Sequence, residues 1–327
     1  MKILVRHESG ESVFDADKDL NLLEQLLIND LPVEYSCKTG DCGLCISTLV
    51  DGDVFVTDVT SILPGEDILL CQTKPLSDVI LEVEIIPELL DIKPRIVPFK
   101  IKVQRLVAED VLNITIKMPP TQKLNYLPGQ HIELNYKNIK RSYSIANYDA
   151  DNNEIELHIR EVKGGAFTSK LFANEIMDRE VIRFYGPLGT FFVRKGESPI
   201  LFLAGGTGYA PIKAMVNQLV AENSTRQIYV YWGMRTFAGF YDNSIEKLSK
   251  IYTNINFISV ASDERMIGDE NKGARLGFVH RAVLADFPGL HGFQVYACGG
   301  QVMVESAKAD FVAAGLGAED FFADVFC

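Results

Sequence analysis

The sequence has no apolar run that approaches the roughly 18 residues that a transmembrane helix requires. Its first ten residues, MKILVRHESG, become polar too early for a signal peptide. We therefore expect a cytoplasmic protein with no membrane partner. The chain has 327 residues, 47% of them hydrophobic and 23% charged, which is enough for two or three domains with separate cores.

Positive charge is scarce in the first 92 residues. They contain 5 Lys and Arg against 19 Asp and Glu, a net charge of −14, whereas residues 93–327 contain 27 against 25, a net charge of +2. A field of that sign repels nucleic acid, so we expect no nucleic-acid partner, and it favours docking to a basic protein. Acidity that only aids solubility is the alternative.

Hydrophobic periodicity predicts a multidomain chain of α+β and α/β class. Two short strands, the helical stretch LNLLEQLLINDL and the alternating strand VILEVEII precede a proline-rich segment that suits a linker. Short strands with turn signals then predict an antiparallel barrel, and apolar strands that alternate with helices predict a parallel sheet. The predicted segments are a first domain over 1–92, a linker over 93–98, a barrel over 99–195 and an α/β domain over 196–327.

Cysteine is scarce as well, and four of the six cysteines follow one pattern. Cys37, Cys42 and Cys45 have C-x4-C-x2-C spacing, and 25 residues separate Cys45 from Cys71. This is the spacing of plant-type [2Fe–2S] ligands. Zinc sites usually have two C-x2-C pairs, of which the chain has one, and a Rieske centre needs Cys-x-His pairs, which are absent. We predict that these four cysteines bind a [2Fe–2S] cluster, with zinc or unliganded thiols as alternatives.

With this pattern, residues 1–92 resemble a plant-type ferredoxin. The resemblance implies a β-grasp sheet with one helix, and a surface that docks to its partners through carboxylates. Brief, charge-steered encounters suit electron transfer better than tight ones.

The segment RSYSIAN, residues 141–147, matches the R-x-Y-S signature of the ferredoxin–NADP reductase superfamily. The resemblance implies that Arg141 binds a flavin phosphate, that Tyr143 packs on the isoalloxazine ring and that Ser144 hydrogen-bonds to its N5 atom. The side chains suit these roles, because arginine binds phosphate bidentately, tyrosine has a flat apolar face and a hydroxyl both donates and accepts.

Gly164, Gly165 and Thr168 precede the helical stretch SKLFANEI. A glycine-rich turn that enters a helix can bind a pyrophosphate, which favours FAD over FMN. A plain loop is the alternative. His158 is more simply explained as a strand residue than as a catalytic base.

The segment LFLAGGTGYAPIKAM predicts a strand, a glycine loop (Gly205, Gly206, Thr207 and Gly208) and a helix. It lacks the usual G-x-G-x-x-G spacing, but GGTGxAP is the version found in the same superfamily. The glycines let a nucleotide pyrophosphate approach backbone N–H groups. A tight strand-to-helix turn without a ligand is the alternative.

Two later segments resemble the superfamily in the same order. In ACGG, Cys298 falls where a thiol lies beside the nicotinamide, and in FFADVFC, Asp324 falls where an acidic residue lies near the flavin. Phe326 matches the terminal aromatic that covers the isoalloxazine until nicotinamide displaces it. Without the resemblance, Cys298 would be a packed strand cysteine and Phe326 a core aromatic.

The choice of nucleotide is predicted from charge. At VASDERM, this chain has Asp263 where NADPH-dependent members commonly have an arginine. A carboxylate repels a 2′-phosphate and accepts from a ribose hydroxyl, so we predict NADH. Arg265, Lys272 and Arg275 lie close enough in sequence to rescue NADPH binding.

The order of the three domains resembles the reductase components of ring-hydroxylating oxygenases over the whole chain. Segments such as YSCKTGDCGLC and FLAGGTGYAPIKAMV further resemble the reductases of CDP-deoxysugar biosynthesis. The resemblance implies an enzyme that passes electrons from NADH to FAD to [2Fe–2S], and then to a one-electron-accepting partner. The expected partner is an iron–sulfur, pyridoxamine-phosphate-dependent dehydratase of O-antigen sugar synthesis. An oxygenase partner is one alternative, and a non-catalytic carrier or redox-sensing module is another.

Overall fold

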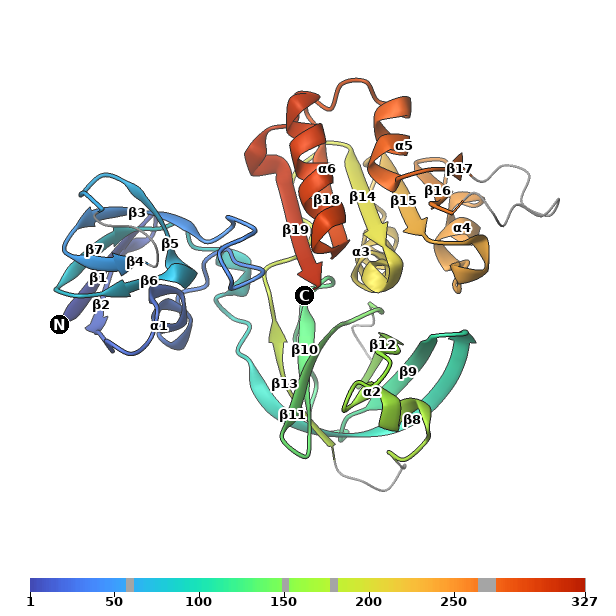
Figure 1. Ribbon diagram of the computed structural model, residues 1–327, viewed down its shortest axis with the longest axis horizontal. Coiled ribbons are helices and arrows are strands. Elements are labelled where there is room, and N and C mark those ends of the chain that lie inside the picture. Colours follow the sequence, from blue (N-terminus) through green and yellow to red (C-terminus); the bar gives the residue numbers. More distant parts are fainter. Residues whose placement is uncertain (57–61, 149–152, 177–181, 264–274, 327) are drawn as a thin grey trace. The chain divides into compact units, whose positions relative to one another are not determined.

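The computed structural model of the chain describes residues 1–56, 62–148, 153–176, 182–263 and 275–326 (Figure 1). It contains two compact units, Met1–Lys93 and Pro94–Cys327. The domain limits inferred from the sequence stay predictions. Residues 95–98, which the sequence assigns to a linker, begin a long strand and pair with another strand of the second unit.

The first unit is a five-stranded sheet with one α-helix. The sheet order is β2-β1-β7-β3-β5, in which β1 and β7 are parallel and the other pairs antiparallel. A capping box at Asn21 and Glu24 starts helix α1, and its leucines pack into the core of the unit. The elements are β1 (Lys2–His7), β2 (Gly10–Asp15), α1 (Leu22–Ile28), β3 (Ile46–Asp51), β4 (Val54–Val56), β5 (Asp67–Leu69), η1 (Leu70–Gln72), β6 (Thr73–Pro75), β7 (Val79–Glu82) and η2 (Pro87–Leu89). Strands β4 and β6 form a separate small ladder.

The second unit begins with an antiparallel sheet of order β11-β10-β13-β8-β9-β12. A bridge between Ile145 and Leu157 joins the segment after β11 to β12, so the two edges of the sheet meet and the sheet curls into a barrel. Alternating apolar side chains fill its interior. The elements are β8 (Arg95–Ala108), β9 (Val111–Lys117), β10 (His131–Tyr136), β11 (Ile139–Ser144), β12 (Glu154–Arg160), α2 (Thr168–Phe172) and β13 (Ile182–Leu188).

The rest of the second unit is a six-stranded parallel sheet of order β17-β16-β15-β14-β18-β19. The order reverses between β14 and β18, and such a switch point is where open α/β sheets bind ligands. The elements are β14 (Ile200–Gly205), η3 (Gly206–Gly208), α3 (Tyr209–Ala221), β15 (Ile228–Met234), η4 (Phe237–Gly239), α4 (Ser244–Ser249), β16 (Ile255–Ala261), β17 (Arg275–Leu276), α5 (Val279–Asp286), β18 (Gln294–Gly300), α6 (Gln301–Ala313), η7 (Ala318–Asp320) and β19 (Phe321–Phe326).

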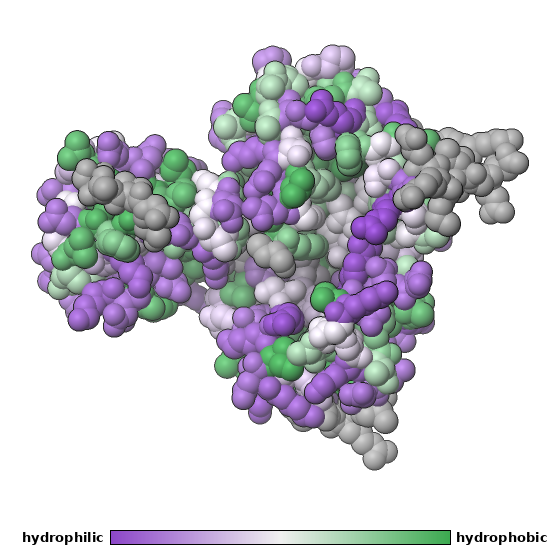
Figure 2. Space-filling model, in the orientation of Figure 1, coloured by the Kyte–Doolittle hydropathy of each residue, from purple (hydrophilic) through white to green (hydrophobic). Residues whose placement is uncertain are grey.

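The predicted fold class is confirmed: a β-grasp-like unit, an antiparallel barrel and a parallel α/β sheet follow one another. Figure 1 shows the carboxyl ends of β14 and β19 pointing toward the barrel strands of the same unit. Among the described residues, no helix has the length and apolar character needed to cross a membrane. On the face that Figure 2 shows, hydrophilic residues cover much of the first unit, with hydrophobic patches between them.

Candidate redox site

The first candidate site is the cysteine loop of residues 37–45. The Cys37 and Cys42 sulfur atoms lie 3.2 Å apart, and the backbone N–H groups of Thr39 and Cys42 point at the Cys37 sulfur at 3.4 and 3.3 Å. Gly40 and Gly43 have φ values of 94° and 71°, which an L side chain rarely adopts and glycine tolerates. The loop therefore turns tightly enough to aim amide groups at sulfur.

The loop is tied to the fourth cysteine by its neighbours. The Leu70 N–H donates to the Cys45 carbonyl at 2.9 Å. The side chain of Gln72, the residue after Cys71, packs against Gly40. A Cβ atom added to Gly40 would lie 2.9 Å from this side chain. The four cysteines predicted to bind the cluster thus belong to one small, connected region, and their thiols are free of disulfides.

Electrostatics in the loop favour a thiolate at its first cysteine. Burial alone would raise the pKa of Cys37, but hydrogen bonds from Thr39 and Cys42 outweigh it and bring the pKa to about 7. Burial raises the pKa of Cys45 to about 12. Placing four thiolates here needs a compensating positive charge, which two ferric ions supply. The donor set therefore fits a [2Fe–2S] cluster.

The R-x-Y-S segment lies on β11 of the barrel. Ser144 is buried, Tyr143 is partly buried, with its ring 6.0 Å from that of Phe167, and Arg141 is exposed. Burial raises the pKa of Tyr143, and the charge of Arg141 opposes this shift only in part. Tyr143 is therefore a neutral, flat side chain, as a contact with an aromatic ring requires.

The turn before α2 is held by its own side chains. The Thr168 hydroxyl accepts from the Val162 N–H and donates to the Val162 carbonyl, both at 3.1 Å. A Cβ atom on Gly165 would lie 2.7 Å from that hydroxyl, and Gly164 has φ of 74°. The structure thus explains Gly164, Gly165 and Thr168 as parts of one tight turn, and their contact with a pyrophosphate stays a prediction.

Three of the predicted hydride-transfer residues meet at the carboxyl end of the parallel sheet. Asp324 on β19 accepts a hydrogen bond from Ser144 at 3.4 Å, and the Cys298 sulfur on β18 lies 4.0 Å from the same carboxylate oxygen. Burial raises the pKa of Asp324 to about 6, although the hydrogen bond from Ser144 opposes the shift. Burial also raises the pKa of Cys298, so its thiol is neutral. Phe326 lies two residues beyond Asp324, paired with Gly300 and partly exposed.

The glycine loop packs directly against this region. A Cβ atom on Gly208 would lie 2.2 Å from the Cys298 carbonyl oxygen, so no other residue fits at 208 without backbone movement. Gly206 has φ of 58°, and its carbonyl accepts from the indole N–H of Trp232 at 2.9 Å. Gly205 and Thr207 lie on either side of it, at the end of β14 and within η3.

A cavity of about 1250 Å³ opens beside the glycine loop. Its walls include side chains from both the barrel and the parallel sheet, among them Arg160, Arg235, Ser262, Phe278 and Arg281. Asp263 follows Ser262, and its N–H donates to the Arg235 carbonyl at 2.8 Å. Asp263 thus lies next to a wall residue of a cavity large enough for a dinucleotide.

The basic residues near Asp263 in the sequence could bind a 2′-phosphate only if their side chains were available beside it. Arg275 pairs with Asp286, an interaction that occupies its guanidinium. Arg265 and Lys272 lie outside the described residues. Arg160, Arg235 and Arg281, which line the cavity, were not predicted from the sequence. Arg235 could have been found, because it directly follows the buried strand QIYVYWGM, where parallel sheets place ligand-binding residues.

Comparison with known proteins agrees with this arrangement. Residues 5–76 match the 2Fe-2S iron-sulfur cluster binding domain, residues 98–193 the oxidoreductase FAD-binding domain and residues 202–309 the oxidoreductase NAD-binding domain. The CDP-6-deoxy-L-threo-D-glycero-4-hexulose-3-dehydrase reductase of Yersinia pseudotuberculosis is 41% identical over 98% of this chain and 97% of its own. The chain belongs to the iron–sulfur flavoprotein reductases.

Two further comparisons concern a more distant relative and a solved structure of the same fold. Reductase component 2 of terephthalate 1,2-dioxygenase from Comamonas is 30% identical over 97% of this chain and 92% of its own. The crystal structure of the Amycolatopsis cytochrome P450 reductase GcoB has the same fold, with a TM-score of 0.78 and 23% identity over 99% and 98% of the two chains. The prediction of an NAD(P)H-dependent oxidoreductase with [2Fe–2S], FAD and NAD is confirmed, whereas the roles of individual residues stay predictions.

Proposed function

We propose that this reductase transfers electrons from NADH to the pyridoxamine-phosphate-dependent dehydratase of CDP-3,6-dideoxyhexose biosynthesis, and so acts as a CDP-6-deoxy-Δ3,4-glucoseen reductase in the cytoplasm. The observation that carries the proposal is the near-complete alignment with the Yersinia 3-dehydrase reductase at 41% identity. The oxygenase reductase is a more distant relative, at 30%.

The cofactors supply the redox chemistry, in which a nicotinamide hydride carries two electrons to a flavin and an iron–sulfur centre takes them one at a time. Cys37, Cys42, Cys45 and Cys71 hold the cluster. The amide groups of Thr39 and Cys42 stabilise negative charge on the Cys37 sulfur. Arg141 binds a flavin phosphate, Tyr143 provides a flat neutral face and the turn at Gly164, Gly165 and Thr168 accepts the FAD pyrophosphate.

Ser144 and Asp324 form a donor–acceptor pair at the hydride-transfer site. Because the pKa of Asp324 is about 6, its carboxylate can take up or release a proton near neutral pH, and Ser144 is placed to relay it. Cys298 provides a neutral, buried thiol beside them. Phe326 would cover the isoalloxazine ring of a bound flavin in the absence of nicotinamide.

The glycine loop Gly205, Gly206, Thr207 and Gly208 binds the nucleotide pyrophosphate through backbone N–H groups. Asp263 accepts a hydrogen bond from the adenosine ribose and repels a 2′-phosphate. We therefore expect kcat/KM for NADH to exceed that for NADPH by about 10-fold or more. Initial rates with a chemical electron acceptor measure this ratio, and a ratio below one contradicts the assignment of Asp263.

The proposal is tested by reconstituting the pathway step under anaerobic conditions. The reductase, NADH, a pyridoxamine-phosphate-dependent CDP-hexose dehydratase and its sugar substrate are mixed, and the 3-deoxy product is measured. We expect product only when the reductase is present. Bleaching of the flavin by NADH without product would contradict the dehydratase as the partner.

A second candidate function is the reductase component of an oxygenase, which the terephthalate dioxygenase relative favours. It predicts NADH-dependent substrate hydroxylation with a terminal oxygenase and no product with the dehydratase. A non-catalytic carrier or redox sensor predicts that NADH leaves the bound flavin oxidised.

A further inference from the structure

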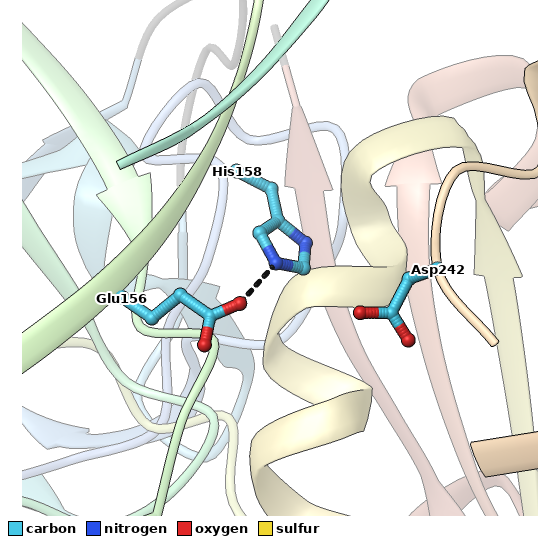
Figure 3. Close-up of side chains that lie close together, drawn as sticks. All are labelled: Glu156, His158 and Asp242. Carbon is cyan, nitrogen blue, oxygen red and sulfur yellow. Dashed lines mark hydrogen bonds and ion pairs between the residues drawn. The ribbon is translucent and has the colours of Figure 1, made fainter. Parts of the chain in front are cut away.

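A buried group of charged side chains connects the barrel to the nucleotide-binding sheet. Lys213 on α3 places its ammonium 2.7 Å from Glu156 Oε1 on β12 and 3.3 Å from Asp242 Oδ2, in the loop before α4. His158, with a fully buried side chain, hydrogen-bonds through Nε2 to the same Glu156 oxygen at 2.8 Å. Figure 3 shows Glu156 and His158 together and Asp242 pointing toward them from the other side. We call Glu156, His158, Lys213 and Asp242 the ionic latch.

The charged groups of the ionic latch are buried, and burying a charge costs folding free energy unless a partner of opposite charge lies close to it. The side chains of Lys213, Glu156 and Asp242 are only 11%, 21% and 16% exposed. Burial alone would raise the pKa of Glu156, but the hydrogen bond from His158 and the charge of Lys213 outweigh it and lower the pKa to about 2. Burial likewise opposes the charge of Lys213, and the two carboxylates more than offset it and raise the pKa of the lysine. Burial alone would raise the pKa of Asp242 as well, but the charge of Lys213 and hydrogen bonds from Ser244 outweigh it and lower the pKa. All three groups are therefore charged, and the ion pair between Glu156 and Lys213 joins the barrel to the parallel-sheet part of the unit.

A cation site formed by Glu156, His158 and Asp242 is the other arrangement that these residues suggest, because their ligand atoms lie within 4.8 Å of one another. However, the Lys213 ammonium already lies between the two carboxylates and forms an ion pair with each of them. A divalent ion would have to displace it. The geometry therefore favours an ion-paired connection over a metal centre.

One end of the ionic latch is close to the flavin strand. The Glu156 carbonyl accepts from the Ala146 N–H at 2.8 Å, and the Glu156 N–H donates to the Asn147 side chain at 2.9 Å. Leu157 bridges to Ile145, the residue after Ser144. The position of Glu156 is thus fixed against the R-x-Y-S segment by backbone pairing.

The other end is close to the glycine loop. Lys213 lies in the second turn of α3, which begins directly after Gly208. Tyr209, the first residue of α3, donates to Asp242 Oδ1 at 3.0 Å and stacks on Trp232 with ring centroids 3.9 Å apart. Its ring also lies parallel to that of His158, at 6.4 Å. The start of α3 is therefore held against β12 by the ion pair between Lys213 and Glu156 and by the stacked rings of Tyr209 and His158.

We propose that the ionic latch is a positioning device, with Glu156, His158, Lys213 and Asp242 fixing the glycine loop relative to the flavin strand so that nicotinamide and flavin meet at hydride-transfer distance. None of the four latch residues is among those predicted to contact the flavin or the nicotinamide. They act by preventing the barrel and the parallel sheet from shifting, and a shift of about 1 Å lowers a reaction rate by about 100-fold. This inference rests on the NADH-to-flavin step of the proposed function and is independent of the identity of the partner.

The test is anaerobic stopped-flow reduction of the full-length holoenzyme by NADH. It measures the NADH dissociation constant, the limiting rate constant of flavin bleaching and the long-wavelength absorbance of the stacked nicotinamide–flavin complex. For Lys213→Met we expect a limiting rate constant lower by about 10- to 100-fold and a weaker absorbance band, with the dissociation constant changed by less than about 3-fold.

The matched control is Lys102→Met. Lys102 pairs with Glu154 at 2.7 Å, and Glu154 lies on the same strand as Glu156, but both partners belong to the barrel. We expect all three quantities to stay at wild-type values. A loss equal to that of Lys213→Met would show that any ion pair on β12 matters, and would overturn the proposal.

A second variant guards against misfolding, because Lys213→Met leaves Glu156 buried without its ammonium partner. Glu156→Gln combined with Lys213→Met removes both charges of that pair, while Asp242 keeps its hydrogen bonds from Tyr209 and Ser244. We expect the same loss of rate with full FAD occupancy. A wild-type rate constant and absorbance band in either variant would overturn the proposal. So would a stoichiometric divalent metal, beyond the cluster iron, that is lost in Asp242→Asn. Normal flavin bleaching without the 3-deoxy product would contradict the dehydratase as the partner and would leave the proposal about the latch unaffected.

Discussion

Three of the four cysteines assigned to the cluster lie within nine residues of one loop, whereas Ser144 and Asp324, which meet at 3.4 Å, are 180 residues apart. In the cysteine loop, the backbone of a few residues aims amide groups and sulfur atoms. At the hydride-transfer site, each group is supplied by a different strand. The first site depends on local backbone conformation, and the second depends on how the barrel and the parallel sheet pack together.

The two sites also differ in electrostatics. The first unit has a net charge of −14 over residues 1–92, carried mostly by exposed carboxylates, whereas the second unit pairs its buried charges internally, as at Glu156 and Lys213. Exposed charge acts at long range and is weakened by salt. Paired buried charge acts at short range and fixes geometry. The same side-chain types thus guide a partner in one unit and hold a site together in the other.

The largest effect on electron transfer is expected from substitutions that disable one of the two sites and leave the other intact. Cys42→Ser removes a thiolate ligand and should lower electron delivery to the partner by about 100-fold or more, while NADH still bleaches the flavin at the wild-type rate. Cys298→Ser, at the hydride-transfer site, should instead slow flavin bleaching by NADH and leave the visible absorbance of the cluster unchanged. Product formation and stopped-flow absorbance measure the two steps. Wild-type delivery by Cys42→Ser would contradict the assigned electron path.

A glycine at the packed site should be more sensitive than one without close neighbours. In Gly208→Ala the added Cβ would lie 2.2 Å from the Cys298 carbonyl oxygen, so the loop must move and flavin bleaching by NADH should slow by about 10- to 100-fold. Gly289→Ala is the control, because the nearest atom to its added Cβ is 4.0 Å away. Equal rates in the two variants would contradict the importance of the contact between the loop and β18.

Asp324 should give the hydride-transfer site a pH dependence near pH 6. With a folded pKa of about 6, its proton state changes near pH 6, and Asp324→Asn should lower the rate of flavin bleaching by about 10- to 100-fold and abolish that pH transition. Rate constants measured from pH 5 to pH 8 test this expectation. A transition near pH 6 that persists in Asp324→Asn would assign it to another group.

The same residue links pH to stability. Because its pKa is raised in the folded state, the contribution of Asp324 to stability is full below its ordinary pKa of 3.8 and is lost as the pH rises through about 6. Asp324→Asn should therefore unfold at a higher temperature than the wild type at pH 7, although it is the less active enzyme. Thermal unfolding at pH 4 and pH 7 provides the comparison, and a lower Tm for the variant at pH 7 would contradict it.

The sequence predicted the local site more completely than the assembled one. The cysteine spacing and the glycines of the loop are contiguous, so their meaning is visible in a single segment. The strand-to-helix motif at Gly205–Gly208 and the R-x-Y-S segment were recognised for the same reason. The ionic latch was not predicted, because Glu156, Lys213 and Asp242 come from separate elements and look like ordinary surface charges. The only local signal was Lys213 among the buried apolar residues of PIKAMV.

The smallest effect is expected from salt. The rate of electron delivery to the partner should fall by about 10-fold when the ionic strength rises from about 0.05 M to about 0.5 M, because the acidic first unit attracts a basic surface. Flavin bleaching by NADH, within the second unit, should change far less. The steady-state rate of electron delivery and the stopped-flow rate of flavin bleaching, measured in the same buffers, give the salt dependence of each step. Equal salt dependence would contradict a docking role for the acidic unit.

The most direct measurement of the whole account follows both sites in one reaction. The anaerobic holoenzyme is mixed with NADH, flavin absorbance is recorded by stopped flow, and samples frozen at intervals are examined by electron paramagnetic resonance. We expect the flavin to bleach first and the signal of a reduced [2Fe–2S] cluster to appear afterwards, in the wild type but not in Cys42→Ser. A fully bleached flavin with no cluster signal in the wild type would contradict the path from the hydride-transfer site to the cysteine loop.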